Sequence, residues 1–190
     1  MSRDRPVLVT QNQHKITELR PLFDKFGVSF DTTDIEKMEI RSEDVEVIAV
    51  AAAKHAHETL GRPVIVDDTG FYLDALNGFP GSYAAFALNT IGYKGILRLM
   101  KGVENRSARF VTAVAYCSDE IMKSFVGTMH GTIADRPAGS GGFGYDPIFI
   151  PEGSQKTYAE MGLEEKVRIS HRTHAFTALL QWYSGAVDKS

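Results

Sequence analysis

Apolar positions follow two spacings along the chain, and these spacings predict alternating strands and helices. A continuous apolar run at 7–10 is typical of a short buried strand. From residue 12 to about residue 26, apolar side chains recur every three or four positions, which predicts a helix that stops before Gly27. A second strand is predicted at 28–31, and a second helix with the same spacing at 45–60.

The middle of the chain is dominated by strand patterns. A short buried strand is predicted at 64–66, and we expect it to end in Asp67-Asp68. Two long apolar runs at 109–117 and 122–134 predict strands that are joined by a hairpin. Between these strand regions, a helix is predicted at about 90–100.

The last third predicts a loop, a strand and two helices. Glycines fill the loop at 136–144, and an apolar strand resumes at 146–150. Helices are predicted at 158–165 and at 170–183, the second with Ser170 as its N-cap. Because helices alternate with strands early and a hairpin lies in the middle, the whole pattern predicts an α/β fold with a mixed sheet.

Composition places the chain among ordinary globular proteins. Its 190 residues, 43% apolar and 24% charged, suffice for one well-buried domain with room for two lobes. No segment approaches the ~18 consecutive apolar residues that span a bilayer, and the start lacks the pattern of a secretory signal. Cys117 is the only cysteine, so no intrachain disulfide can form. We therefore expect a cytoplasmic protein without a membrane partner.

The net charge limits the class of ligand. It is −3 at neutral pH, whereas a non-specific nucleic-acid binder is more often basic, so we expect no nucleic-acid partner. An anionic small molecule is still allowed, provided that positive side chains gather locally. The positions of a few Lys, Arg and His residues are therefore informative.

The first candidate segment lies where the first strand becomes the first helix. The free N–H groups and the dipole of a helix start attract phosphate. Thr10 and Asn12 can hydrogen-bond an anion there, and Lys15 can reach it as a point charge. The alternative is that Asn12 only caps the helix and that Lys15 pairs with Glu18.

The second candidate is Asp67-Asp68-Thr69-Gly70. Successive strand side chains face opposite ways, so only one of the two carboxylates can point into a given site. Magnesium prefers one or two carboxylates together with water and phosphate oxygens. The residues that can supply a second carboxylate are Glu36, Glu39, Glu43 and Asp44. The alternative is a capped turn with Gly70 at positive φ.

Two later segments carry groups suited to a nucleotide base. The stretch 141–149 combines glycines, aromatic faces for stacking and the acceptor Asp146; alternatively, it is a loop with core aromatics. Lys166 and Ser170-His171-Arg172 place positive charge near a helix start, which is mildly unfavourable unless an anion or a base lies nearby. The alternative there is a solvated helix start.

Taken together and in this order, these segments resemble the inosine triphosphate pyrophosphatase family, which removes deaminated purine nucleotides. The matching residues span 10–172, nearly the whole chain: Thr10-x-Asn12-x-x-Lys15-x-x-Glu18, Glu39-Ile-Arg, Asp67-Asp68-Thr69-Gly70, Gly78-Phe-Pro-Gly81-x-Tyr83, Phe143-Gly-Tyr-Asp146-Pro-Ile-Phe149, Lys166 and Ser170-His171-Arg172. Any one segment is weak evidence, but seven in register leave chance as a poor explanation.

The resemblance implies a fold, an activity and partners. The implied fold is a long twisted mixed β-sheet with flanking helices that form two lobes around a central cleft, within one domain of residues 1–190. The implied activity is hydrolysis of ITP, dITP or XTP to the nucleoside monophosphate and pyrophosphate, with one or more Mg²⁺ ions per subunit. The resemblance also implies a homodimer.

The same resemblance assigns roles to individual residues. Glu39 and Asp68 would hold the metal, and Asp68 would also accept the proton of the attacking water. The residues that would bind substrate are Thr10, Gln11, Asn12, Gln13, His14, Lys15, Lys54, Thr69, Phe143, Gly144, Tyr145, Asp146, Lys166, His171 and Arg172. Lys54 follows an apolar stretch, and its alternative role is simply to reach solvent. The chain departs from many relatives at Arg41 and at Ala85-Phe86, where they carry Gln and a basic residue.

Three other interpretations remain open. One is a related pyrophosphatase that acts on modified pyrimidine nucleotides, which a substrate panel would separate. Another is a non-catalytic nucleotide sensor, against which the pair Glu39 and Asp68 argues. The third is a protein-interaction module, against which Lys15, Lys166 and Arg172 argue.

Overall fold

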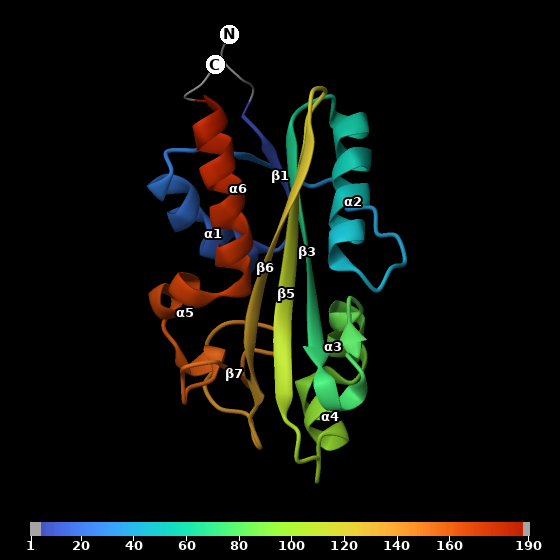
Figure 1. The fold of residues 1–190 in the computed structure, drawn as a ribbon, viewed down its shortest axis with the longest axis vertical. Coiled ribbons are helices and arrows are strands. Elements are labelled where there is room, and N and C mark those ends of the chain that lie inside the picture. The colour runs from blue at the N-terminus through green and yellow to red at the C-terminus, as the bar shows by residue number, and fades with distance from the viewer. Residues whose placement is uncertain (1–4, 188–190) are drawn as a thin grey trace. The chain divides into compact units, whose positions relative to one another are not determined.

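The computed structural model describes residues 5–187, and within them the strands form one mixed sheet (Figure 1). The strand order is β2-β1-β3-β5-β6-β7, and β4 pairs with β3. The strands are β1 (Val7–Val9), β2 (Asp31–Thr33), β3 (Val64–Leu73), β4 (Pro80–Gly81), β5 (Ser107–Cys117), β6 (Met122–Ile133) and β7 (Phe149–Pro151). β1 runs parallel to β2 and β3, whereas β4 and β7 run antiparallel to their partners. The predicted α/β fold with a mixed sheet is confirmed.

The described chain divides into two compact units. Unit 1 comprises residues 5–68, 112–127 and 172–187, and unit 2 comprises 69–111 and 128–171. Each of β3, β5 and β6 contributes residues to both units.

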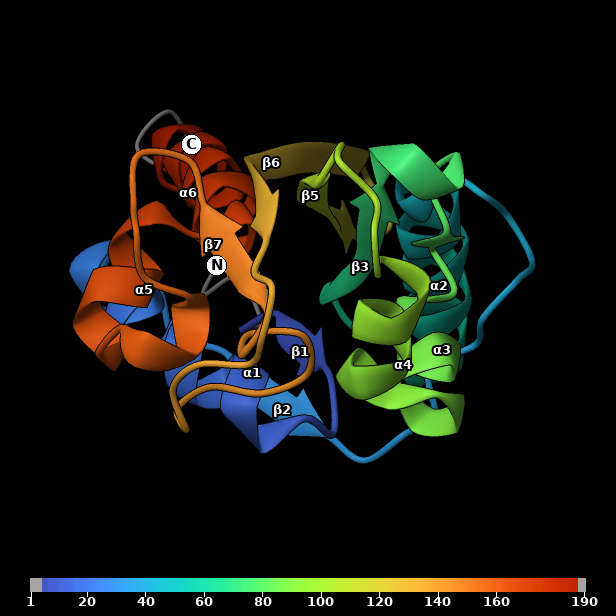
Figure 2. The same cartoon turned by 90° about the horizontal axis from the view of Figure 1, so that it is seen from below.

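In unit 1, helices cover both faces of the sheet (Figures 1 and 2). Helices α1 (Gln13–Lys25) and α6 (His171–Val187) pack on one face, where Phe23 and Phe176 lie in the same apolar core as Leu8 and Ile65 of the strands. Helix α2 (Val45–Leu60) packs on the other face through small side chains such as Ala49 and Ala53, which are fully buried. Burial on both faces explains why β1 and the start of β3 are continuously apolar.

Unit 2 is built around a cluster of aromatic rings. Phe71 of β3 stacks on Tyr145 with 4.5 Å between ring centroids, and Phe110 of β5 meets Phe149 of β7 edge to face at 4.8 Å. Helices α3 (Ala84–Thr90) and α4 (Gly92–Leu99) flank one side of this part of the sheet. The short helices η2 (Tyr158–Glu160) and α5 (Leu163–Ile169) lie beside β7 on the other side (Figure 2), and η1 (Asp74–Leu76) follows β3.

The two long N-terminal helices were predicted correctly, and their caps explain why. Asn12 caps α1 and Gly27 follows it in a left-handed conformation, φ 64°. Asp44 caps α2, and Gly61 ends it in the same conformation. The predicted hairpin is also present, since the backbone N–H of Ser118 donates to Ile121 between β5 and β6.

The prediction that a strand ends at Asp67-Asp68 is wrong. β3 continues through both residues to Leu73, and Phe71 and Leu73 beyond them are fully buried. The two carboxylates do not break the strand because each meets a cationic partner, described below. The alternative that placed Gly70 at positive φ is also wrong, because Gly70 is a strand residue.

Four other boundaries differ from prediction. The helix expected at about 90–100 is present as α4, whereas α3, which ends at Thr90, was not predicted; Gly92, with φ 67°, lies where the two helices meet. The helix expected at 158–165 divides into η2 and α5, and the strands β2 and β7 begin three residues later than expected. No helix within residues 5–187 has the length and apolar character to cross a membrane.

Candidate functional site

In unit 1 the ammonium group of Lys37 is held by three oxygens. Lys37 Nζ lies 2.7 Å from Asp68 Oδ1 and 3.1 Å from Glu39 Oε1. It also donates to the backbone carbonyl of Asp67 at 3.4 Å. The two carboxylates that the sequence predicts as metal ligands, Glu39 and Asp68, therefore already share one cation.

The neighbouring residue Asp67 belongs to a buried charge cluster. Lys15 Nζ donates to Asp67 Oδ2 at 2.7 Å, and Arg172 Nε lies 3.9 Å from the same oxygen. Burial alone would raise the pKa of Asp67, but the charges of Lys15 and Arg172 lower it below its ordinary value. Burial lowers the pKa of Lys15, and Asp67 only partly offsets that effect. Glu18 pairs with Arg172 at 2.6 Å. The alternative in which Lys15 pairs with Glu18 is therefore wrong, because each of the two residues pairs with a residue far away in the sequence.

The adjacent carboxylates face different partners because side chains alternate along a strand. Asp67 meets Lys15, whereas Asp68 meets Lys37. Burial raises the pKa of Asp68 above its ordinary value, and the attraction of Lys37 opposes this effect without cancelling it. A carboxylate with a raised pKa is a better proton acceptor than an ordinary aspartate.

The donor set around Asp68 is of the kind that binds magnesium. Asp68 Oδ2 and Asp67 Oδ1 are buried, and neither has a hydrogen-bond partner among the described residues. Within residues 5–187 no group of three or more His, Cys, Asp or Glu side chains is placed to hold a metal. Two carboxylates nevertheless suffice for Mg²⁺, which takes its remaining ligands from water and phosphate.

The helix-start segment is ordered by its own side chains. Asn12 Oδ1 accepts from the backbone N–H groups of His14 and Lys15, at 3.0 and 3.4 Å, and Thr10 Oγ1 accepts from the N–H of Asn12 at 3.1 Å. Asn12 therefore does cap the helix, as the alternative held. Gln11 and Gln13 are exposed, and Gln11 Nε2 donates to the carbonyl of Asp34 at 2.8 Å.

In unit 2 two of the predicted base-binding residues, Asp146 and Lys166, form a buried ion pair. Lys166 Nζ donates to Asp146 Oδ2 at 2.6 Å, with only 4% and 5% of the two side chains exposed. The same carboxylate oxygen accepts from the backbone N–H of Phe143 at 2.8 Å, and the Lys166 ammonium lies 4.8 Å from the centroid of the Phe143 ring. Gly142 is required here, because its φ is 70° and a Cβ would overlap Asp146.

Two other predicted residues of unit 2 have clear structural roles. Tyr145 is buried and donates its hydroxyl to the carbonyl of Ala84 at 2.8 Å, and burial raises its pKa. The alternative that this loop carries core aromatics is therefore correct for Tyr145. The ring of His171 stacks on Phe110 with 4.5 Å between centroids and 13° between planes, while Thr69 and Gly144 are half-buried.

This chain is similar to known proteins over nearly its whole length. The model of the Ham1 family matches residues 6–182. The chain is 44% identical to a dITP/XTP pyrophosphatase of Methanopyrus kandleri over 95% of this chain and 97% of the relative. It is 48% identical to one of Pyrobaculum aerophilum, over 92% of this chain and 94% of the relative.

The chain belongs to the Ham1 family. Its fold matches the solved Ham1 protein of Staphylococcus aureus with a TM-score of 0.82 at 30% identity, covering 95% of this chain and 99% of that one. The resemblance inferred from the motifs is thereby confirmed.

One residue at the candidate site of this Ham1-family chain was missed by sequence reasoning. Lys37 contacts both predicted metal ligands, yet none of the matching motifs includes it. The only local signal was its place in an acidic stretch, with Glu36 before it and Glu39 two residues after it. The nearer of its two carboxylate partners, Asp68, lies 31 positions away in the sequence.

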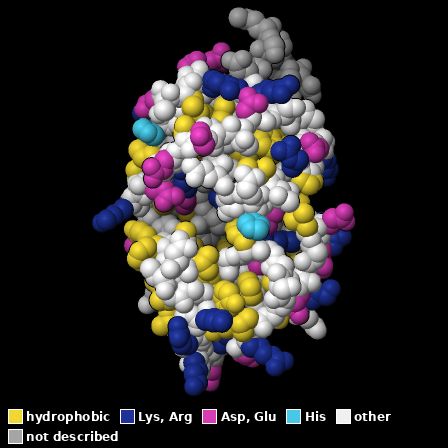
Figure 3. Space-filling model, turned by 180° about the vertical axis from the view of Figure 1, so that it is seen from behind, with side chains coloured by type: hydrophobic (Ala, Val, Ile, Leu, Met, Phe, Trp, Pro, Cys, Tyr) yellow, Lys and Arg dark blue, Asp and Glu magenta, His cyan; other side chains and the backbone are white. Residues whose placement is uncertain are grey.

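Lys54 is exposed on α2. Its charge acts on Cys117, whose pKa is raised by burial and by Glu58 and Asp119. On the face shown in Figure 3, basic and acidic side chains are interspersed with apolar ones.

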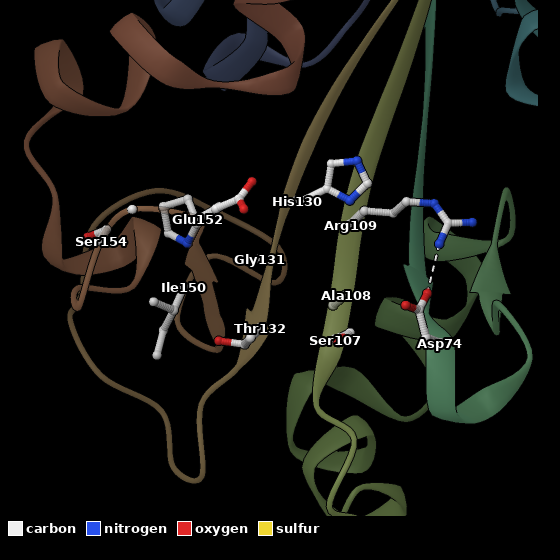
Figure 4. Close-up of a pocket in the computed structure, with 12 residues that line it drawn as sticks. Asp74, Ser107, Ala108, Arg109, His130, Gly131, Thr132, Ile150, Glu152 and Ser154 are labelled. Carbon is white, nitrogen blue, oxygen red and sulfur yellow. Dashed lines mark hydrogen bonds and ion pairs between the residues drawn. The ribbon is translucent and has the colours of Figure 1, made fainter.

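A polar pocket of about 450 Å³ lies elsewhere in unit 2, on β5, β6 and β7 (Figure 4). The residues that line it include Arg109, His130 and Glu152, and none of them was predicted as a site residue. Arg109 is already engaged, because it donates to Asp74 at 2.8 Å and lies over the ring of Tyr72 at 4.9 Å.

Proposed function

We propose that this protein hydrolyses deaminated purine nucleoside triphosphates, namely ITP, dITP and XTP, to the nucleoside monophosphate and pyrophosphate. The observation that carries the proposal is the convergence of Glu39 and Asp68 on one cation, next to the buried pair of Lys15 and Asp67. The names of the relatives, dITP/XTP pyrophosphatases, support the same substrate class. Removing such nucleotides would keep them out of DNA and RNA.

Pyrophosphatases of the Ham1 family are generally metal-dependent. We propose Mg²⁺ for this chain, with Glu39 and Asp68 as its protein ligands. Their carboxylate oxygens fit a hard cation that leaves room for water and phosphate oxygens. When bound, the ion would offset the negative charge of the phosphates and favour deprotonation of a nearby water.

The residues of unit 1 would bind the phosphates and move one proton. Asp68 would accept a proton from the water that attacks the α-phosphorus, and a positioned base of this kind typically contributes about 10²–10⁴-fold to the rate. Lys15, at the start of α1, would place a positive charge on the phosphates, and Thr10 to His14 would add hydrogen bonds. Lys54 would add a further phosphate contact, and Thr69 would touch the substrate. Pyrophosphate would leave with the bridging oxygen.

A second set of residues would select the base. Phe143 offers an aromatic face and Asp146 an acceptor, Gly144 and Tyr145 shape the loop between them, and Lys166, His171 and Arg172 offer donors. Hypoxanthine and xanthine present a 6-oxygen that accepts from such donors, whereas the 6-amino group of adenine leaves a donor unpaired. Each unpaired buried donor costs about 1–3 kcal/mol, so a few of them produce a strong preference.

The test is a substrate panel. Pyrophosphate release should be measured with Mg²⁺ for ITP, dITP, XTP, dGTP, ATP and dUTP, with and without EDTA. We expect high kcat/KM for the first three and loss of activity in EDTA. Preference for dUTP would instead assign the protein to the pyrimidine-specific alternative. The oligomeric state, which we propose to be a homodimer, is measured on the same sample by light scattering.

A further inference from the structure

We propose that Lys37 is a built-in counter-cation of the metal site, which a divalent ion must displace before it can bind to Glu39 and Asp68. The inference rests on the proposed metal pair and adds a residue that the family motifs do not contain. If the inference holds, the affinity of the nucleotide-free protein for a metal ion depends on Lys37 as well as on the two carboxylates.

The contacts of Lys37 are those expected of a cation in an oxygen site. Its ammonium is held by Asp68 Oδ1, Glu39 Oε1 and the carbonyl of Asp67, at 2.7, 3.1 and 3.4 Å. A lysine is a compact point charge with three donors, so it can satisfy three separate oxygens. A divalent ion that used the same two carboxylates would need the position that the ammonium now takes.

The charges around Asp68 explain why a lysine ammonium is favourable at this position. Asp68 and Glu39 bring two carboxylates to the same ammonium, and Asp68 has only 11% of its side chain exposed. Without a cation, a buried carboxylate among like charges is strongly disfavoured. Lys15 neutralises Asp67, and Lys37 does the same for Asp68. The two lysines therefore divide the adjacent acids between them.

The ammonium also has a route out of the site. The Lys37 side chain is 19% exposed and Glu39 is 67% exposed, so both are in contact with solvent. The lysine stem is flexible, and the displaced charge would remain tethered beside a substrate that carries several negative charges. Displacement should therefore cost less when a triphosphate is present than when it is absent.

Binding of Mn²⁺, followed by the EPR signal of the free ion, tests the proposal without reference to turnover. Lys37→Met should bind Mn²⁺ on the order of tenfold more tightly than the wild type in the absence of nucleotide, because the competing charge is gone. The difference in Mn²⁺ affinity between Lys37→Met and the wild type should become smaller when a non-hydrolysable triphosphate is added. Lys94→Met, which removes an exposed lysine from α4, is the matched control and should leave the affinity unchanged.

The variants Glu39→Gln and Asp68→Asn separate this inference from the proposed function. If neither weakens Mn²⁺ binding, the metal pair itself is wrong and the proposed function loses its basis. If both weaken binding while Lys37→Met and Lys37→Gln, each folded by circular dichroism, bind Mn²⁺ no better than the wild type, the role of Lys37 is overturned.

A second measurement uses the wild-type protein and does not depend on the folding of any variant. Saturating Mg²⁺ should free the Lys37 ammonium and raise its rate of acylation by a mild amine reagent, as followed by mass spectrometry. Lys94 serves as the internal reference. An unchanged or lower rate at Lys37, in a sample shown to bind the ion, contradicts displacement.

Discussion

The guanidinium of Arg172 donates to the carboxylate of Glu18, with 2.6 Å between Nη1 and Oε2, and so joins the start of α6 to α1. Only 4% and 7% of the two side chains are exposed. Arg172 also lies 3.9 Å from Asp67 through Nε. Because Asp67 precedes Asp68 in β3, this arginine helps to hold the backbone that carries the proposed base.

Replacing Arg172 by Ala should narrow the preference for ITP over ATP, because the proposal counts Arg172 among the donors to the 6-oxygen. The variant should also be less stable, since Glu18 and Asp67 stay buried without it. The ratio of kcat/KM for the two nucleotides and urea unfolding measure the two effects. Glu18→Gln separates them, because it should lower stability and leave the ratio intact. An unchanged ratio in Arg172→Ala would remove Arg172 from base selection.

Replacing Asp68 by Asn should abolish turnover of ITP and leave the fold intact. The amide keeps the shape of the side chain but neither accepts the proton nor holds the metal as well, so a loss of at least about 10²–10⁴-fold is expected. Pyrophosphate release is the measurement. The matched control is Asp135→Asn, where the carboxylate is 91% exposed and activity should not change. Near-normal release by Asp68→Asn would defeat the base assignment.

Replacing Lys166 by Met should destabilise unit 2. Asp146 would then keep a buried charge without its ammonium partner, at a cost of about 3–5 kcal/mol. Urea unfolding measures this cost. The double variant Asp146→Asn/Lys166→Met should recover part of the loss, because the unpaired charge is removed as well. Equal stability of the single and double variants would show that the ion pair is not what Met disrupts.

Replacing Gly142 by Ala should destabilise the protein and weaken nucleotide binding. The new Cβ would overlap Asp146 Oδ2, in addition to the strain of φ 70°. Gly153→Ala is the control, because Gly153 has φ 79° and no atom within 4 Å of an added Cβ. The free energy of unfolding of the control should fall only by the cost of a left-handed backbone at a non-glycine residue, about 1–2 kcal/mol. Its KM should not change. Equal losses in urea unfolding would exclude the contact with Asp146 as the cause.

The pKa of Asp67 predicts how stability depends on pH. Its pKa is lowered in the folded protein, so the folded state binds fewer protons than the unfolded state at acidic pH, and stability falls as the pH falls. The contribution of ionised Asp67 is complete above its unfolded pKa, about 3.9, and is lost as the pH falls through the folded value. The stability difference between wild type and Asp67→Asn should therefore narrow from pH 6 to pH 3 in urea unfolding. A constant difference would show that Asp67 is not linked to the transition.

Local sequence determined those features whose causes lie within one segment. The helices α1 and α2 were predictable because apolar spacing, an N-cap and a terminal glycine all occur within a few residues of one another. The Ham1 family was predictable because its motifs occur in order along the chain. The end of β3 was not, because Asp67-Asp68 looks like a strand end until the cations that neutralise it are known.

Only the tertiary structure decided which charges meet. Lys15 contacts Asp67, 52 positions away in the sequence, and Lys37 contacts Asp68, 31 positions away. Both contacts form because β2, β1 and β3 are neighbours in the sheet, so the segments that follow β1 and β2 lie close to β3. A charged side chain has no preferred partner within its own segment, and its partner depends on which strands lie side by side. The sequence therefore predicts which types of residue form the site. Only the packing of strands that are distant in the sequence lets Glu39 and Asp68 share one ammonium.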